Sequence, residues 1–196
     1  GNFRPNAPIT RAEVAQIFYR LLRDETRKGQ SVELYQRFED VADNAWYATA
    51  VNTLASLGII NGTSATTFAP NRSITRAEFT AICTRFAKKL TGTSTFTDVP
   101  ASFWAYNNIA AAADMGWVVG SGTGKFNPNA SITRTEAAAI VNRMLGRLGD
   151  FDAIDAGAGR RFPDVSATFW GFYDIVEATT AHEYTFDSDR LYEDWD

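Results

Sequence analysis

Two short blocks each recur three times in this chain of 196 residues, with the same internal spacing in every copy. The first block runs from Phe-x-Pro-Asn to Ile-Thr-Arg-(Ala/Thr)-Glu, and its Arg always lies eight positions after its Phe. The second block is Phe-x-Asp-Val followed by a Trp, which also lies eight positions after its Phe. Repetition at fixed spacing indicates that the chain folds from copies of one small unit.

The end of the first block predicts the start of a helix. Thr at the N-cap and Glu three residues later form a capping box, in which each side chain accepts from the backbone amide of the other residue. An apolar stripe with helical spacing follows each copy, so we expect helices at about 10–28, 75–90 and 133–148. The capping-box residues are Thr10 and Glu13, Thr75 and Glu78, and Thr133 and Glu136.

The second block predicts a turn and then a short helix that starts near its Trp. These helices are expected at about 45–57, 103–115 and 168–180. No long strand pattern is present, so the expected fold class is all-α, with six main helices. The repeated polar and aromatic residues of this block are Asp40 and Trp46, Asp98 and Trp104, and Asp164 and Trp170.

Composition argues against several classes of function. The net charge of −4 opposes nucleic-acid binding, which needs clustered basic groups, and no apolar run is long enough for membrane insertion. With one cysteine and one histidine, the chain lacks a disulfide framework and a cysteine-cluster metal site. It also lacks a nucleophile elbow and a phosphate loop. We therefore expect no enzyme activity, no cofactor and no bound metal.

The two blocks together resemble the surface-layer homology (SLH) module, over roughly residues 1–28, 38–90 and 96–184. The most specific part of the resemblance, Ile-Thr-Arg-(Ala/Thr)-Glu, is present three times. The resemblance implies a pseudo-threefold helical bundle of three SLH-type repeats joined by short turns. It also implies an extracellular module that anchors bacterial proteins non-covalently to the cell wall. The implied partner is secondary cell wall polysaccharide, an anionic glycan that often carries a pyruvylated sugar.

The chain does not begin and end at repeat boundaries. It divides into the second half of a repeat plus a connector (1–37), a repeat (38–95), a repeat plus a Gly/Ala-rich linker (96–161), and the first half of a repeat plus an acidic tail (162–196). All four segments are expected to form one pseudo-trimeric domain. We predict that the Trp170 helix packs on the Arg11 helix, so that the two ends of the chain complete one unit.

The Arg at the first helical position of each copy is the main candidate for ligand binding. A helix N-terminus offers free N–H groups and a positive dipole end, and a guanidinium adds a bidentate fork for a carboxylate. If exposed, these arginines would affect binding and hardly affect stability. In grooves between repeats, the Trp rings would stack on sugars and the Asp carboxylates would accept from hydroxyls. The full predicted ligand-binding set is Arg11, Arg76, Arg134, Trp46, Trp104, Trp170, Asp40, Asp98 and Asp164.

Each predicted site residue also has a structural interpretation. The arginines can pair with the repeated Asp or Glu, the tryptophans can pack between repeats, and the aspartates can close a turn. Helix initiation explains the capping-box residues, which would line a groove only secondarily. At the level of function, the alternative is a structural module that contacts neighbouring surface-layer subunits in a lattice, without sugar binding.

The third copy of the pattern departs from the others at two positions. Thr135 replaces the Ala of the other copies, and His182 replaces their Gly. We therefore expect the copies to be non-equivalent and the turn at His182 to be altered.

Overall fold

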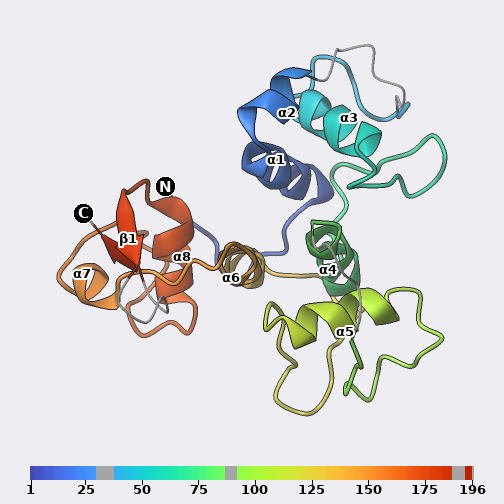
Figure 1. Cartoon of the computed structure of the whole chain (residues 1–196). Coiled ribbons are helices and arrows are strands. Elements are labelled where there is room, and N and C mark those ends of the chain that lie inside the picture. Colours follow the sequence, from blue (N-terminus) through green and yellow to red (C-terminus); the bar gives the residue numbers. More distant parts are fainter. Residues whose placement is uncertain (30–37, 87–91, 187–192, 196) are drawn as a thin grey trace.

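Three helical lobes surround a common centre in the computed structural model, which describes residues 1–29, 38–86, 92–186 and 193–195 (Figure 1). The described residues form eight helices and one pair of short strands, which confirms the expected all-α class. The helices are α1 (Arg11–Leu21), α2 (Asp24–Gly29), α3 (Ala48–Ser56), α4 (Arg76–Thr84), α5 (Tyr106–Asp114), α6 (Arg134–Leu145), α7 (Phe151–Asp155) and α8 (Phe172–Thr179). The strands are β1 (Tyr184–Phe186) and β2 (Glu193–Trp195).

A cycle of three backbone hydrogen bonds joins the lobes at the centre. The amide of Ile74 donates to the carbonyl of Ile9 (3.1 Å), Ile132 donates to Ile74 (3.0 Å), and Ile9 donates to Ile132 (3.2 Å). These three residues are at most 3% exposed. The Thr that follows each Ile caps the central helix of its lobe, α1, α4 or α6, and both hydrogen bonds of each predicted capping box are present.

Each central helix packs against the helix that the following copy of the second block forms. The pairs are α1 with α3, α4 with α5, and α6 with α8. The prediction that the Trp170 helix packs on the Arg11 helix is therefore wrong. The physical reason is that α3 already covers the apolar face of α1. The third lobe instead repeats the local pairing of the other two, and α8 covers α6.

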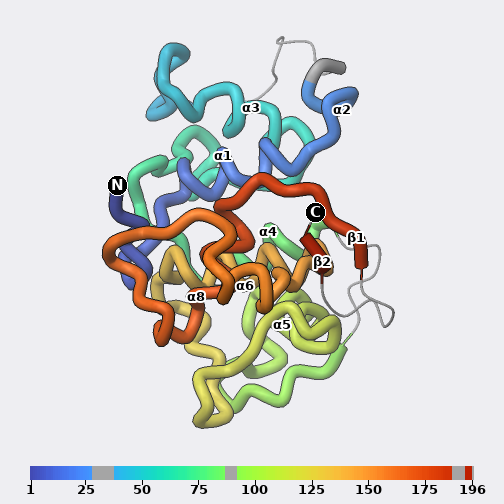
Figure 2. The backbone as a smooth tube through the Cα atoms, turned by 90° about the vertical axis from the view of Figure 1, so that its left-hand side faces the viewer, coloured from blue at the N-terminus to red at the C-terminus, as the bar shows by residue number. Residues whose placement is uncertain are grey.

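The N-terminal segment nevertheless lies against the segment before α8, and the contact is made through a turn instead of through two helices (Figures 1 and 2). The carboxylate of Asp164 accepts from the backbone amides of Phe3 (2.9 Å) and Arg4 (2.7 Å). The rings of Phe3 and Phe162 lie 5.3 Å apart. The equivalent contacts within the chain join Asp40 to Phe68 and Ala69, and Asp98 to Phe126 and Asn127. The N-terminal block thus makes with the third lobe the contact that the first block following each Asp makes in the other two.

These aspartates hold a turn that has an unfavourable backbone conformation. The residue between Phe and Pro is left-handed in each copy, with φ of 58° at Arg4, 58° at Ala69 and 57° at Asn127. This conformation costs a non-glycine residue about 1 kcal/mol or more. Desolvation opposes ionisation of Asp98, but the amide hydrogen bonds outweigh it, and its pKa lies below the usual value. The ionised carboxylate therefore stabilises the turn.

Asp164→Ala tests whether this contact joins the ends of the chain. We expect it to lower the melting temperature about as much as Asp98→Ala, which removes the same contact from the middle of the chain. The pKa of both carboxyls is lowered in the folded protein, so the stabilisation is present at neutral pH and is lost as the pH falls through the folded-state pKa. Thermal unfolding at neutral and acidic pH measures both effects. An Asp164→Ala variant that melts like the wild type would show that the contact does not join the ends.

Several elements differ in extent from the sequence prediction. The central helices end earlier than expected, at Leu21, Thr84 and Leu145, and each Trp lies two residues before its helix. Apolar periodicity identifies a buried face but leaves the helix ends uncertain by one or more residues. The expected linker at 146–161 contains α7, and part of the acidic tail forms β1 and β2, which pair antiparallel. Parts of the connector (30–37), of the second predicted helix (87–90) and of the tail (187–192 and 196) lie outside the described residues.

The third lobe contains a matched pair of substitutions where α6 meets the start of α8. Thr135, which replaces the Ala of the other copies, is 0% exposed, and its hydroxyl donates to the carbonyl of Pro5 (2.9 Å). A Cβ added at Gly171 would lie 2.1 Å from Cγ2 of Thr135. The other copies have a side chain at the position of Gly171, namely Tyr47 and Ala105. The side chain of Thr135 on α6 thus fits because Gly171, just before α8, has no side chain.

Gly171→Ala is expected to destabilise the protein by about 1–3 kcal/mol, because the added methyl group overpacks against Thr135. Combining it with Thr135→Ala removes the clash and should recover most of that loss, apart from the hydrogen bond to Pro5. Urea unfolding of the two single variants and the double variant gives the coupling energy. If the two substitutions change stability additively, Thr135 and Gly171 are not energetically coupled, and the proposed compensation between them is wrong.

Candidate functional site

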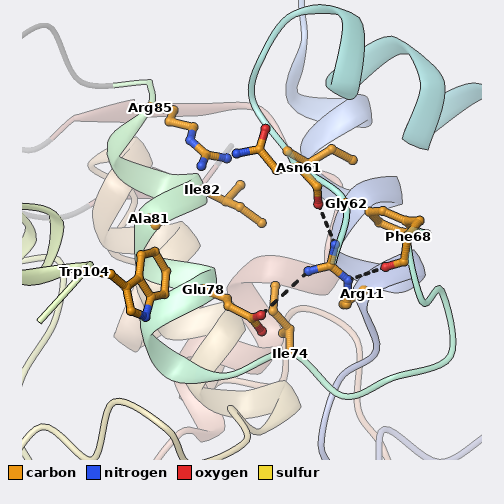
Figure 3. Close-up of a pocket in the computed structure, with 11 residues that line it drawn as sticks. Arg11, Asn61, Gly62, Phe68, Ile74, Glu78, Ala81, Ile82, Arg85 and Trp104 are labelled. Atoms are coloured by element: carbon orange, nitrogen blue, oxygen red, sulfur yellow. Dashed lines mark hydrogen bonds and ion pairs between the residues drawn. The ribbon is translucent and has the colours of Figure 1, made fainter. Parts of the chain in front are cut away.

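A groove between α1 and α4 has a volume of about 240 Å³, and we name it the Arg11 groove (Figure 3). Asn61, in the loop after α3, lies on one side of the Arg11 guanidinium, and Glu78 of α4 lies on the other. Arg85, at the end of α4, and Trp104, which precedes α5, also line the groove. Residues from two lobes therefore meet at this boundary.

A second groove, between α6 and α1, has a volume of about 690 Å³, and we name it the Arg134 groove. Glu13 and Arg20 line it from α1, and Trp46 takes the position that Trp104 has in the Arg11 groove. Much of the remaining wall is apolar and is formed by Ile17, Leu21, Ala137, Ala138, Val141, Leu145 and Ala178. The two grooves share an Arg at a helix start, a capping-box Glu, a second Arg and a Trp.

The repeated arginines each bind the Phe of a first block. In every copy Nε donates to the Phe carbonyl, and the guanidinium also lies over the ring of the same residue, at 4.4 to 5.1 Å from its centroid. The hydrogen bonds join Arg11 to Phe68 (2.7 Å), Arg76 to Phe126 (2.8 Å) and Arg134 to Phe3 (2.8 Å).

The same arginines form a cycle of ion pairs between lobes. Each guanidinium faces the capping-box Glu of the next central helix, so that this Glu both caps its own helix and contacts the neighbouring lobe. The pairs are Arg76–Glu136 (2.6 Å), Arg134–Glu13 (3.2 Å) and Arg11–Glu78 (4.0 Å). The arginines thus make the structural contacts that their alternative interpretation predicted, while two of them also line the grooves.

The expectation that these arginines are exposed is wrong for Arg11, which is only 6% exposed. Burial lowers the pKa of the Arg11 guanidinium, and the charge of Glu78 opposes this effect. The loop after α3 and the turn at Phe68 cover the side chain by binding it, through the carbonyls of Asn61 and Phe68. The exposure of Arg11 depends on the loop after α3, which lies about fifty residues away, and the residues around Arg11 do not indicate that this loop covers it.

Arg11→Ala is therefore expected to cost about 1–3 kcal/mol of stability, because it leaves the carbonyls of Phe68 and Asn61 without their donor. Arg134→Ala is the matched control, since its side chain is 25% exposed, and its loss should be smaller. Chemical unfolding of both variants measures the difference. An Arg11→Ala variant as stable as the wild type would contradict the structural role.

The three predicted tryptophans lie on the surface: Trp46 is 63% exposed, Trp104 is 60% exposed and Trp170 is 61% exposed. They do not belong to the core, although packing between repeats was one interpretation of the sequence. Trp46 and Trp104 each line one groove, and Trp170 is their counterpart in the repeat pattern. Large apolar rings presented at equivalent surface positions are suited to contact a ligand.

The predicted aspartates do not line either groove. Asp40, Asp98 and Asp164 each bind two backbone amides of a Phe turn, as described above, and this is the turn-closing role considered from the sequence. Their carboxylates accept from the amides of the same Phe residues whose carbonyls accept from the arginines.

A second repeated arginine was missed by the sequence analysis. It follows the first by nine positions in every copy, as Arg20, Arg85 and Arg143. Arg20 and Arg85 line the two grooves, and Arg85 donates to the carbonyl of Ile59. The signal was present in the aligned repeats, because the position is Arg in all three.

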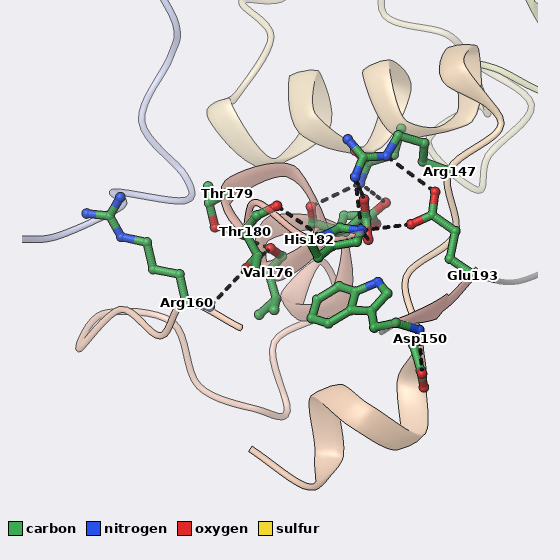
Figure 4. A network of polar contacts seen from close by, with 12 residues as sticks. Arg147, Asp150, Arg160, Val176, Thr179, Thr180, His182 and Glu193 are labelled. Carbon is green, nitrogen blue, oxygen red and sulfur yellow. Dashed lines mark hydrogen bonds and ion pairs between the residues drawn. The ribbon is translucent and has the colours of Figure 1, made fainter. Parts of the chain in front are cut away.

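The structure also reveals a buried polar cluster in the third lobe (Figure 4). Arg147 pairs with Glu177 (2.6 Å) and with Glu193 (3.3 Å), and His182 Nε2 lies 3.0 Å from Glu193. The pKa of Glu177 is raised, mainly by desolvation. The charge of Glu193 also raises it, and the charge of Arg147 lowers it. One ligand atom from each of Glu177, His182 and Glu193 lies within 4.8 Å of the others, a spacing that suits a metal ion, but Arg147 already binds both carboxylates. The cluster fixes β2 against α8.

The fold and these boundaries define an all-α module of three repeated lobes with arginines between them. The S-layer homology domain model matches residues 1–15, 37–80 and 95–138, which together are more than half of the chain. The chain belongs to the S-layer homology domain family. The matched ranges stop before residues 162–196, where Asp164 contacts the N-terminal block.

Several curated proteins are similar to this chain. Cell surface glycoprotein 1 of Acetivibrio thermocellus is 34% identical over 97% of this chain and 8% of its own length. The cellulosome-anchoring protein of the same organism is 36% identical over 95% of this chain and 42% of its own length. An amylopullulanase of Thermoanaerobacterium thermosulfurigenes is 39% identical over 76% of this chain and 8% of its own length. The chain thus spans less than half of each relative.

Proposed function

We propose that this chain is a non-catalytic module that anchors a surface protein to the bacterial cell wall by binding secondary cell wall polysaccharide between its lobes. The observation that carries the proposal is the repeated combination of an arginine pair with an exposed Trp at a lobe boundary. A guanidinium binds a carboxylate with two parallel hydrogen bonds, as a pyruvylated sugar would require. An exposed indole offers an apolar face to a sugar ring.

Local charge supports an anionic ligand in a chain whose net charge is −4. In the Arg11 groove, Arg11 and Arg85 face Glu78, and in the Arg134 groove, Arg134 and Arg20 face Glu13. Each boundary therefore carries more positive than negative side chains, and the field near a ligand is set by these nearby groups.

The relatives support an anchoring role outside the cell. One is named as an anchoring protein, one as a cell surface protein and one as an enzyme, and the chain matches only part of each. A segment shared by proteins with such different names is best explained as a module that positions the rest of the protein. No helix in the described part of this chain is long and apolar enough to cross a bilayer, and attachment through the wall needs none.

The carboxylates that line the grooves have structural roles, which argues against catalysis. Glu13 and Glu78 each cap a helix and face an arginine of the neighbouring lobe. A glycosidase needs two carboxylates about 5–10 Å apart with different proton affinities across a cleft. Each groove is lined by a single carboxylate, so this arrangement suits binding.

Sedimentation with native wall sacculi of the source organism tests the proposal. The chain should sediment with native sacculi, and chemical removal of the polysaccharide should abolish this. The triple variant Trp46→Ala/Trp104→Ala/Trp170→Ala should bind about tenfold or more weakly, because tryptophans dominate binding energy where they stack. Its melting temperature should stay close to that of the wild type, since the rings are exposed. Equal binding to stripped sacculi would instead favour a module that contacts protein subunits.

A further inference from the structure

Backbone carbonyls of the loop after α3 bind both arginines of the Arg11 groove (Figure 3). Nη2 of Arg11 donates to the carbonyl of Asn61 (2.6 Å), and Arg85 donates to the carbonyl of Ile59. Both guanidinium groups therefore already have acceptors supplied by the protein. A ligand carboxylate that binds here competes with these carbonyls for the guanidinium donors.

The loop after α5 acts in the same way at the boundary between α4 and α6. Nη2 of Arg76 donates to the carbonyl of Val119 (3.2 Å), the counterpart of Asn61, and its Nη1 pairs with Glu136 (2.6 Å). The side chain of Arg76 is only 12% exposed. The guanidinium is again largely occupied by the protein.

Among the residues that the structure describes, no such loop carbonyl binds the arginines of the Arg134 groove. The chain after α8 continues through His182 into β1, which pairs with β2, and the cluster around Arg147 holds this segment. In the part of the chain that the structure describes, Nε of Arg134 donates to Phe3 and Nη1 to Glu13, while Nη2 has no partner. Arg20 and its counterpart Arg85 are both exposed, but among the described residues only Arg85 has a polar partner, the carbonyl of Ile59.

As lined by the described residues, this groove is also larger, with a volume of about 690 Å³ against about 240 Å³ for the Arg11 groove. The added space is bordered by apolar side chains of α1 and α6, which suit the apolar faces of sugar rings. Two arginines with uncommitted donors suit a carboxylate. The groove thus combines charge complementarity with room for more than one sugar.

We propose that the three lobe boundaries differ in binding strength and that the Arg134 groove is the principal site, occupied by a glycan segment that bears a carboxylate. This inference rests on the proposed function. Arg134 and Arg20 bind the carboxylate, and Trp46 stacks on a neighbouring sugar ring. The other two boundaries bind the same glycan more weakly, because their loop carbonyls compete for the guanidinium groups.

Three matched variants test the proposal in the full chain, because their tryptophans are equally exposed and equivalent in position. With native wall sacculi as the probe, Trp46→Ala should weaken binding about tenfold, and Trp104→Ala and Trp170→Ala only about twofold each. A second pair removes charge: Arg20→Gln should weaken binding more than Arg85→Gln does. Raising the salt concentration should reduce the difference within this pair, because exposed charges are screened.

The outcomes separate the two proposals. If Trp104→Ala or Trp170→Ala weakens binding as much as Trp46→Ala, the special role of the Arg134 groove is wrong while wall binding stands. The same conclusion follows if Arg85→Gln weakens binding as much as Arg20→Gln. If the triple Trp variant binds like the wild type, the proposed function itself is wrong. Melting temperatures of all variants show whether a loss of binding comes from unfolding.

Discussion

The cycle of backbone hydrogen bonds through Ile9, Ile74 and Ile132 is the constraint on which the rest of the structure depends. Buried amides and carbonyls need partners, and three segments that each donate to the next satisfy all six groups. Two segments could not close this cycle in the same geometry. The chain must therefore contribute three copies of the Ile-Thr-Arg block, and the lobes then follow from the helices that these blocks start. The described residues meet this requirement with the blocks at Ile9, Ile74 and Ile132.

The cycle also fixes where the candidate site lies. The Arg that follows each Thr starts its helix at the centre, so its side chain reaches the boundary with the next lobe, where a capping-box Glu faces it. The same side chains therefore serve folding and line the grooves. A loss of binding after Arg11→Ala would mix both effects, because Arg11 is buried and bound by carbonyls. The exposed tryptophans separate binding from folding more cleanly.

The sequence predicts local features of this protein better than distant ones. The capping boxes and the buried faces of the central helices depend on residues a few positions apart, and the structure contains them. The partner of α8 and the burial of Arg11 depend on contacts between residues far apart in the sequence, and both predictions were wrong. The second arginine of each groove was missed although it repeats, since its function is visible only once two lobes are brought together. The cluster of Arg147 and Glu193 was missed because it joins residues 46 positions apart in a part of the chain without a repeat.

The departure at His182 connects these observations. Gly58 and Gly116 adopt left-handed conformations, with φ of 68° and 72°, and let the chain turn back after α3 and α5 toward the arginines. A histidine enters this conformation only at an energetic cost, and His182 does not adopt it. Its side chain instead lies against Glu193, and the chain leads into β1, away from the loop path of the other lobes. In the sequence, His182 is a departure from the glycine of the other two copies. In the described part of the structure, Arg11 and Arg76 are each bound by a loop carbonyl that has no counterpart at Arg134, so the altered turn at His182 accompanies a less occupied arginine.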